Sequence, residues 1–143
     1  MINDFYRDKK VLITGHTGFK GSWMCRVLLN AGAYVSGYAL KPEEGNNLYN
    51  MAGMLAVDSH IGDICDLNHL MEVFDEVQPE IVIHMAAQPL VRESYRDPVG
   101  TYNTNVIGTV NVLECVRTHK SVKSFVNVTT DKGVANYKVV IMK

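Results

Sequence analysis

Three regularly spaced glycines near the N-terminus constrain the fold of this chain more than any other feature. They are Gly15, Gly18 and Gly21, and they join the β-branched segment Val11–Thr14 to a segment, 21–31, whose apolar residues recur at helical spacing. In a strand–loop–helix unit, such glycines permit a tight turn, a close approach of backbone to a pyrophosphate, and close packing of the helix on the strand. Free N–H groups and partial positive charge at the helix N-terminus favour an anion there. The spacing therefore predicts a βαβ unit with a dinucleotide-binding loop.

The alternation of strand and helix continues along the chain. β-rich segments at 33–40, 59–61, 81–83 and 124–129 predict four further strands. Helical spacing, with caps at Asp66 and at Asp97-Pro98, predicts helices over 67–77 and 98–119. Strands separated by helices imply right-handed crossovers and parallel pairing. We therefore expect an α/β fold with a Rossmann-type three-layer parallel sheet, incomplete at about five strands with crossover helices.

Like the helix over 67–77, the other two predicted helices have an apolar face. In the helix after the glycine loop, the apolar positions are Trp23, Met24, Val27, Leu28 and Ala31. In the long helix that begins at Pro98, they are Tyr102, Val106, Val110, Leu113 and Val116. The spacing in both is that of a helix with one face buried.

Composition excludes several classes of function. The 143 residues are 47% hydrophobic and carry a formal net charge of −1, which predicts one folded domain without affinity for nucleic acid or an anionic membrane. The longest apolar run, around 81–87, is too short to span a bilayer, and the N-terminus lacks the pattern of a signal peptide. We therefore expect a cytoplasmic protein. Cys25, Cys65 and Cys115 are widely spaced, so we expect neither a metal site nor a disulfide.

Polar and small residues follow the later predicted strands, at the sheet edge where such folds bind ligands. They are Asp63 after the third strand, His84-Met85-Ala86-Ala87-Gln88 after the fourth and Thr129-Thr130-Asp131-Lys132 after the fifth, with Asn105 inside the long helix. Each also has a structural interpretation: Asp63 as a turn residue, Ala86 and Ala87 as small packing residues, His84 as a core histidine, Asn105 as a partner for a neighbouring loop, and Asp131-Lys132 as a solvated turn. Their order after successive strands favours one shared binding site.

These motifs together resemble the extended branch of the short-chain dehydrogenase/reductase superfamily. Longer segments are similar to the CDP-glucose 4,6-dehydratase family, over about residues 11–132. Those segments are 15–23, 37–40, 59–64, 84–92 and 127–132. The most specific is Thr130-Asp131-Lys132, because related sugar-nucleotide dehydratases usually carry Thr-Asp-Glu at that place.

The resemblance implies a lyase of deoxysugar and lipopolysaccharide biosynthesis that converts CDP-glucose to its 4-keto-6-deoxy product, with NAD as an internal hydride carrier. It implies that Thr130 binds the sugar 4-oxygen, that Asp131 protonates the departing 6-hydroxyl, and that Lys132 assists the elimination. Arg92 is a candidate substrate contact. The implied cofactor contacts are Gly15, Thr17, Gly18, Phe19, Lys20, Gly21, Asp63, Ile64, Ala86, Ala87, Gln88, Asn105 and Thr129. The full-length form is expected to be a homodimer, with the helix that begins at Pro98 in the interface.

The residues alone leave the choice between NAD and NADP open. An acidic residue about twenty positions beyond Gly21 would hold the ribose hydroxyls. Ala39 stands near that position instead, and the nearby Lys41 could accept a 2′-phosphate. These residues favour NADP, whereas the resemblance favours NAD, and we expect NAD.

The end of the chain departs from the family pattern. Extended short-chain enzymes use a Tyr-x-x-x-Lys pair beyond the fifth strand, but Tyr137 is followed four residues later by Ile141. We therefore expect the N-terminal part of an NAD-binding domain over 1–132, a divergent tail over 133–143, and no substrate domain. Such a truncated chain is expected to be inactive and poorly soluble, with one edge of its sheet open. The alternatives are an epimerase or reductase of the same superfamily and a non-catalytic dinucleotide-binding remnant.

Overall fold

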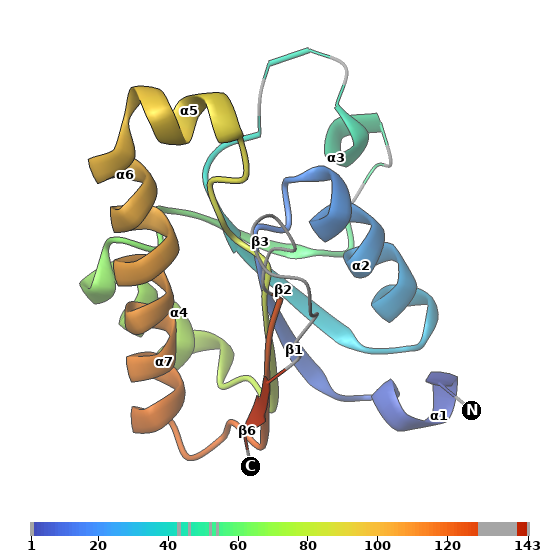
Figure 1. Ribbon diagram of the computed structural model, residues 1–143. Helices are drawn as coiled ribbons and strands as arrows, with labels where there is room; N and C mark the ends of the chain where they lie inside the picture. Colours follow the sequence, from blue (N-terminus) through green and yellow to red (C-terminus); the bar gives the residue numbers. More distant parts are fainter. Residues whose placement is uncertain are drawn as a thin grey trace.

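The computed structural model describes residues 2–42, 44–45, 47–51, 53, 55–128 and 140–142 (Figure 1). Its centre is a six-stranded sheet in the order β3-β2-β1-β4-β5-β6. The strands are β1 (Lys10–Thr14), β2 (Tyr34–Ala39), β3 (Asp58–Ile61), β4 (Ile81–His84), β5 (Ser124–Asn127) and β6 (Val140–Met142). The helices are α1 (Ile2–Tyr6), α2 (Phe19–Asn30), α3 (Leu48–Met51), α4 (Leu67–Val77), α5 (Val91–Arg96), α6 (Pro98–Tyr102), the π-helix η1 (Asn103–Ile107) and α7 (Gly108–Thr118). The first five strands pair in parallel, so the predicted Rossmann-type fold is confirmed.

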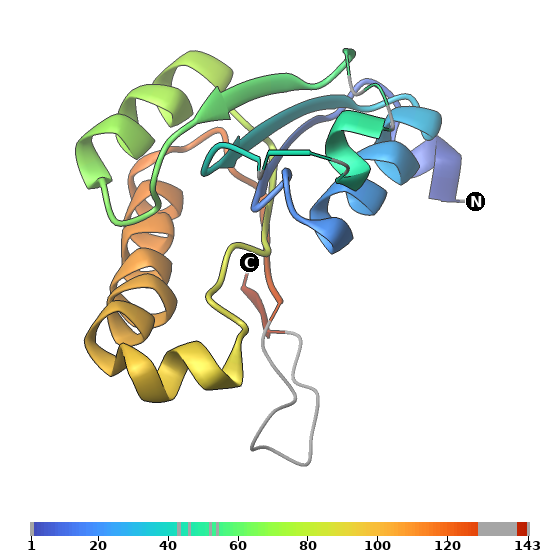
Figure 2. The ribbon, with the colours of Figure 1, turned by 90° about the horizontal axis from the view of Figure 1, so that it is seen from above.

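Helices cover both faces of the sheet (Figures 1 and 2). On one face, Val11 and Ile13 of β1 join a core cluster that contains Leu28 of α2. On the other face, Leu12 joins a cluster that contains Leu70 of α4 and residues of α7. Successive side chains of a strand point to opposite faces. The four consecutive buried residues of β1 therefore contribute to both cores, as is typical of a central parallel strand.

The buried face of α2 differs from the predicted one. Leu28 and Ala31 are buried as expected, but Trp23 and Val27 are 54% and 51% exposed. The helix begins at Phe19, and its buried side is set by the glycine turn, where Gly21 and Ser22 are pressed against the loop. Close contact at the helix start, rather than the largest apolar side chains, determines the rotation of α2 about its axis.

The predicted long helix is interrupted by the π-helix η1. Asp97 caps its start as predicted, because the carboxylate accepts the N–H of Gly100. A π-helix holds more residues per turn than an α-helix, so positions before and after it do not share the face predicted from a 3.6-residue period. Of the predicted apolar positions, Leu113 and Val116 pack at the margin of the core, whereas Tyr102, Val106 and Val110 are 70%, 47% and 52% exposed.

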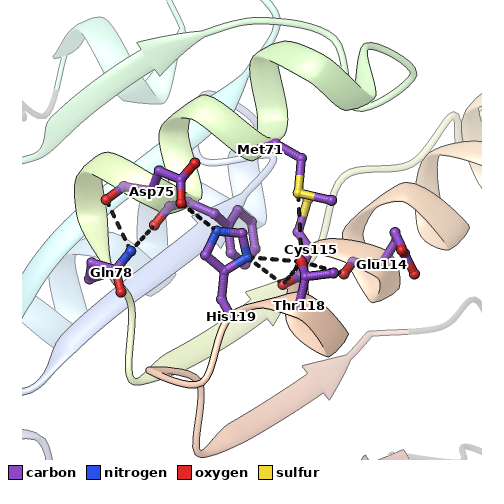
Figure 3. A network of polar contacts seen from close by, with 8 residues as sticks. Met71, Asp75, Gln78, Glu114, Cys115, Thr118 and His119 are labelled. Carbon is purple, nitrogen blue, oxygen red and sulfur yellow. Dashed lines mark hydrogen bonds and ion pairs between the residues drawn. The ribbon is translucent and has the colours of Figure 1, made fainter.

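Polar contacts tie the C-terminal ends of α4 and α7 together (Figure 3). The His119 ring directly follows α7, with Nδ1 at 2.7 Å from the Cys115 carbonyl oxygen and Nε2 at 3.1 Å from the Asp75 carboxylate. The hydroxyl of the preceding residue, Thr118, lies 3.7 Å from the sulfur of Met71. These contacts hold the C-terminal end of α7 against α4.

The β5 edge of the sheet is not open. β6 pairs with β5 in antiparallel fashion, in the register Phe125↔Met142, Val126↔Ile141 and Asn127↔Val140. The expectation of an uncovered edge is therefore wrong, because the β-branched residues of the tail add a strand. The short helices α1, α3 and α5 were also not predicted, since elements of four to six residues are too short to show a helical period.

Two kinds of feature are absent from the part of the chain that the structure describes. None of its helices is long and apolar enough to cross a membrane. Within the same residues, no three His, Cys, Asp or Glu side chains gather in a way that could hold a metal ion.

Removal of a core side chain should show how much of the stability comes from packing between the sheet and α4. Leu70 is fully buried there, so Leu70→Ala is expected to lower the free energy of unfolding by about 2–5 kcal/mol. The matched control is Leu55→Ala, because Leu55 is 99% exposed and the same substitution should change stability by less than about 0.5 kcal/mol. Urea denaturation measures both, and equal effects would contradict this packing.

Candidate functional site

The glycine turn after β1 is built by contacts that leave no room for side chains. Gly15 has a φ of +79°, and its N–H donates to the Tyr38 carbonyl oxygen at 2.8 Å. A Cβ added to Gly15 would lie 2.9 Å from the backbone nitrogen of Ala86. A Cβ added to Gly21 would overlap the Gly15 carbonyl. These two glycines therefore serve the fold, by letting the turn approach both the β4–α5 segment and the start of α2.

Gly18 differs from its two neighbours because it is not crowded by the protein. It is exposed, its φ and ψ of −75° and 167° suit any residue, and among the described residues the nearest atom to an added Cβ is the Gly15 carbonyl oxygen at 3.4 Å. Gly18 precedes the first turn of α2, where no described side chain caps the free N–H groups. The space beside Gly18 is thus open to a ligand, and the adjacent N–H groups suit a pyrophosphate.

Other predicted loop residues surround this space. Phe19 is 69% exposed and Lys20 is exposed, so both side chains are free to contact a ligand at the helix start. The Thr17 hydroxyl donates to the Leu40 carbonyl oxygen at 3.0 Å, which ties the loop to the end of β2. The loop is therefore fixed to the end of β2 through Thr17, while the side chains of Phe19 and Lys20 stay accessible to solvent.

The predicted residues after β3 lie beside the same edge of the sheet. Asp63 is exposed, and its carboxylate accepts the N–H of Cys65 at 2.9 Å, which is the turn role considered above. Ile64 is buried in the core, and its carbonyl oxygen accepts the Asn111 side-chain amide at 2.9 Å. The Asp63 side chain remains exposed, whereas the Ile64 side chain is buried in the core.

A buried histidine lies beneath the glycine loop. The His16 Nε2 is 2.7 Å from the Ser59 hydroxyl, and the ring occupies the space that a Cβ on Gly37 would need. Burial, with a smaller contribution from the neighbouring His60, lowers the pKa of His16 to about 4, against the opposing effect of the Tyr38 backbone. His16 therefore stays neutral at pH 7 and serves as a spacer between the loop, β2 and β3.

His84 is likewise buried, at the end of β4. Its Nδ1 is 2.6 Å from the Thr14 hydroxyl, and its Nε2 is 3.0 Å from the Thr109 hydroxyl. Burial lowers the pKa of His84 to about 4. His84 is therefore a core histidine, as the structural interpretation has it: the residue is 2% exposed, and each ring nitrogen has a hydrogen-bond partner.

Asn105 of the π-helix holds the segment that follows β4. Its side-chain oxygen accepts the N–H of Gln88 at 2.8 Å, and its amide donates to the Gln88 carbonyl oxygen at 3.1 Å. The Gln88 side chain in turn donates to the Thr101 hydroxyl at 2.9 Å. The expected partnership of Asn105 with a neighbouring loop is thus confirmed, and it fixes Ala86, Ala87 and Gln88 at the sheet edge.

A cavity of about 560 Å³ opens at the carboxyl ends of β4 and β5. Its lining comes from the β4–α5 segment, α5, α6, the π-helix, α7 and β5, and includes His84, Ala86, Gln88, Asn105 and Val128. It lies beside the place where strand order reverses between β1 and β4, and open α/β sheets bind their ligands at such a place. The described site is therefore one continuous edge, from the glycine loop to this cavity.

Not every predicted residue takes part in that edge. Arg92 is exposed on α5 and does not line the cavity, although its neighbour Val91 does. Thr129, Thr130, Asp131 and Lys132 lie outside the described residues; the last described residue before them, Val128, lines the cavity. Thr14 and Thr109, which sequence reasoning missed, are central to the site. Thr109 lies four residues after Asn105, and this helical spacing is the signal that could have pointed to it.

Comparison with known proteins agrees with this geometry. Residues 12–133 match the sequence profile of the family described as GDP-mannose 4,6 dehydratase. The chain belongs to this family. It is 49% identical over 134 residues to CDP-glucose 4,6-dehydratase of Salmonella typhimurium, which covers 93% of this chain and 37% of the relative. It spans about a third of the length of the curated relatives it matches.

Solved structures show the same fold. The epimerase Mth375 of Methanothermobacter thermautotrophicus superposes with a TM-score of 0.78 at 26% identity, over 96% of this chain and 43% of its own. The UDP-glucose 4-epimerase of Thermus thermophilus, solved with NAD, superposes with a TM-score of 0.67 at 32% identity, over 76% of this chain and 34% of its own. The family is thus one of dehydratases and epimerases that act on nucleotide sugars, built on a dinucleotide-binding fold.

Mild acid should destabilise the chain through its buried histidines. The pKa values of His16 and His84 are lowered from 6.5 to about 4, so the unfolded chain takes up their protons more readily than the folded one. Their contribution is complete above about pH 6.5 and is lost as the pH falls toward 4, at up to about 3 kcal/mol for each ring. Urea denaturation at pH 7 and pH 4.5 measures this loss. Equal stability at the two pH values would show that the rings are not buried as described.

Proposed function

We propose that this chain carries the N-terminal part, residues 1–132, of the NAD-binding domain of a CDP-glucose 4,6-dehydratase. The single observation that carries the proposal is the open space beside Gly18 at the uncapped start of α2, next to the point where strand order reverses. The similarity to the Salmonella enzyme supports the choice of substrate. NAD in a solved structure of a related epimerase supports the choice of cofactor.

Different residues at the carboxyl ends of the strands would bind different parts of the cofactor and the substrate. When bound, NAD supplies the hydride acceptor and donor for oxidation at sugar C4 and reduction at sugar C6. Gly18 and the first N–H groups of α2 would bind the pyrophosphate, and Asp63 would face the adenine. Ala86 and Gln88 would line the path toward the reacting carbons.

The elimination falls to residues after β5. Thr130 would hydrogen-bond the sugar 4-oxygen and so place C4. After oxidation at C4, the 4-keto group acidifies the C5 proton, and water leaves as the C5 proton and the 6-hydroxyl depart. Asp131 would protonate the leaving hydroxyl, and Lys132 would accept the C5 proton or stabilise the enolate. The net reaction is the loss of one water, and the cofactor ends as it began.

The exposed apolar side chains of α6, η1 and α7 support the proposal that the full-length protein is a homodimer. Val99, Tyr102, Val106, Ile107 and Val110 are between 47% and 78% exposed on these consecutive helices. A second copy of this surface would remove them from water.

Substitution of Gly18 should separate ligand binding from folding. Among the described residues nothing crowds Gly18, and its backbone conformation suits any residue, so Gly18→Val is expected to fold. The valine side chain would occupy the space proposed for the pyrophosphate, so this variant should bind NAD at least about tenfold more weakly. Gly21→Ala is the contrasting control, since its Cβ would overlap the Gly15 carbonyl and should disrupt the fold itself. Calorimetric titration with NAD and with NADP, together with circular dichroism, gives both readouts.

Unchanged NAD affinity in folded Gly18→Val would show that the loop does not bind pyrophosphate. The wild-type chain is expected to prefer NAD. A clear preference for NADP would instead assign Lys41 to a 2′-phosphate.

The 143-residue chain should not turn over CDP-glucose by itself. Proton removal from the 4-hydroxyl needs a phenolate-type base with a neighbouring lysine, and beyond β5 the sequence holds no Tyr-x-x-x-Lys. That spacing does occur at Tyr6 and Lys10. Lys10, however, begins β1 and so lies at the amino ends of the parallel strands, whereas the candidate site lies at their carboxyl ends. The loss of such a base is worth roughly 10²–10⁴-fold in rate.

The test compares this chain with one extended by a Tyr-x-x-x-Lys-containing segment and a substrate domain, with NAD and CDP-glucose supplied. Only the extended chain is expected to form the 4-keto-6-deoxy sugar. Turnover by the short chain would disprove the assignment of the missing base. Binding of NAD without turnover in either chain would favour a dinucleotide-binding module over a dehydratase.

A further inference from the structure

The hydrogen bonds around Thr14 fix which nitrogen of His84 carries the proton. The Thr14 hydroxyl oxygen accepts the backbone N–H of Ala86 at 3.2 Å and that of Met85 at 3.1 Å, which the Thr14 carbonyl oxygen also accepts at 3.2 Å. A hydroxyl has two acceptor positions and one proton, so the proton of Thr14 is left to point at the third neighbour, His84 Nδ1, at 2.6 Å. Nδ1 is therefore an acceptor and carries no hydrogen.

The other side of the ring leads to the same assignment. His84 Nε2 lies 3.0 Å from the Thr109 hydroxyl, and that hydroxyl donates its own proton to the Asn105 carbonyl oxygen at 2.8 Å. Thr109 can then only accept from the ring, so Nε2 carries the hydrogen. The ring is neutral, in the Nε2–H form. Both of its described polar neighbours are threonine hydroxyls, and neither is a charged group.

These bonds form a continuous relay from the sheet to the segment after β4. The relay runs from Thr14 through His84 and Thr109 to Asn105, whose side chain then clamps the backbone of Gln88. The segment between β4 and α5 is neither helix nor strand (Figure 2). Its N–H groups at Ala86 and Gln88 are held by side chains of β1 and of the π-helix, and the N–H of Met85 is shared between the side chain and the carbonyl oxygen of Thr14.

We propose that His84 is a positioning residue, which, as a neutral Nε2–H imidazole bonded to Thr14 and Thr109, sets the place of Ala86–Gln88 for the nicotinamide half of the cofactor. The inference rests on the proposed function, because it takes NAD as the ligand. Asp63, after β3, and the cavity, at β4 and β5, lie on opposite sides of the glycine loop. With the adenine at Asp63, the half of NAD beyond the pyrophosphate must therefore reach the segment that the relay holds. His84 does not itself exchange protons with a substrate, since both ring nitrogens are already engaged.

The experiment combines nitrogen NMR of the full chain with binding of two ligands. In the wild-type chain, the His84 ring is expected to show the hydrogen on Nε2 at pH 7 and to stay neutral at pH 5.5. Thr109→Val removes the acceptor of the ring and the donor to Asn105 with little change in volume. This variant is expected to bind NAD about tenfold more weakly, while its affinity for ADP-ribose, which lacks the nicotinamide, stays within twofold of wild type.

Two further variants make the test specific. Thr109→Ser keeps the hydroxyl and is expected to restore the wild-type ratio of the two affinities. Thr118→Val makes the same change as Thr109→Val on the same helix, where the hydroxyl donates only within the α4–α7 contact (Figure 3), and it should leave that ratio unchanged.

The outcomes that overturn the inference are distinct. A hydrogen on Nδ1, or an imidazolium at pH 7, would disprove the relay. Two results would show that the relay supports the fold and does not position the cofactor. One is an equal fall in affinity for NAD and ADP-ribose in Thr109→Val. The other is failure of that variant to fold while Thr118→Val folds. Failure of the wild-type chain to bind either ligand would overturn the proposed function, and the inference with it.

Discussion

The contact between the glycine turn and the elements around it is the constraint on which the rest of the structure depends. Gly15 lies against the backbone of Ala86, and Gly21 lies against Gly15, so β1, β4 and α2 meet with backbone alone between them. Any side chain at either position would force these three elements apart. Their close approach places the N-terminus of α2 at the point where strand order reverses, and this creates the candidate site.

The second element of the site is a polar network in an otherwise apolar interior. A buried polar group is costly unless it is hydrogen-bonded, and the Thr14, His84 and Thr109 side chains satisfy one another. Together with Asn105, this arrangement lets an irregular segment, from Met85 to Gln88, lie at the carboxyl ends of the strands with the N–H groups of Met85, Ala86 and Gln88 paired. The network therefore explains how a segment that is neither helix nor strand acquires a defined place beside the cavity.

The π-helix links this network to the packing of the helices. The extra residue of η1 shifts the buried face of the long helix, so that Asn105 and Thr109 reach the β4–α5 segment while Val112 and Cys115 fill the core. The same shift turns Tyr102 and Val110 outward. One local irregularity thus supplies a side chain to the candidate site and an apolar surface to the exterior.

The sequence by itself determined the fold class, the parallel pairing of about five strands, the glycine loop and the positions of Asp63, Ala86, Gln88 and Asn105 near the carboxyl ends of the strands. These features follow from local patterns, namely β-branched runs, caps and glycine spacing, and each is decided within a few residues. Only the tertiary structure decided which face of α2 and of the long helix is buried. It alone brought Thr14 and Thr109 to His84, and it alone paired the tail with β5. Those outcomes depend on contacts between residues far apart in the chain, such as Thr14 and His84, which are 70 positions apart, and no local pattern records them.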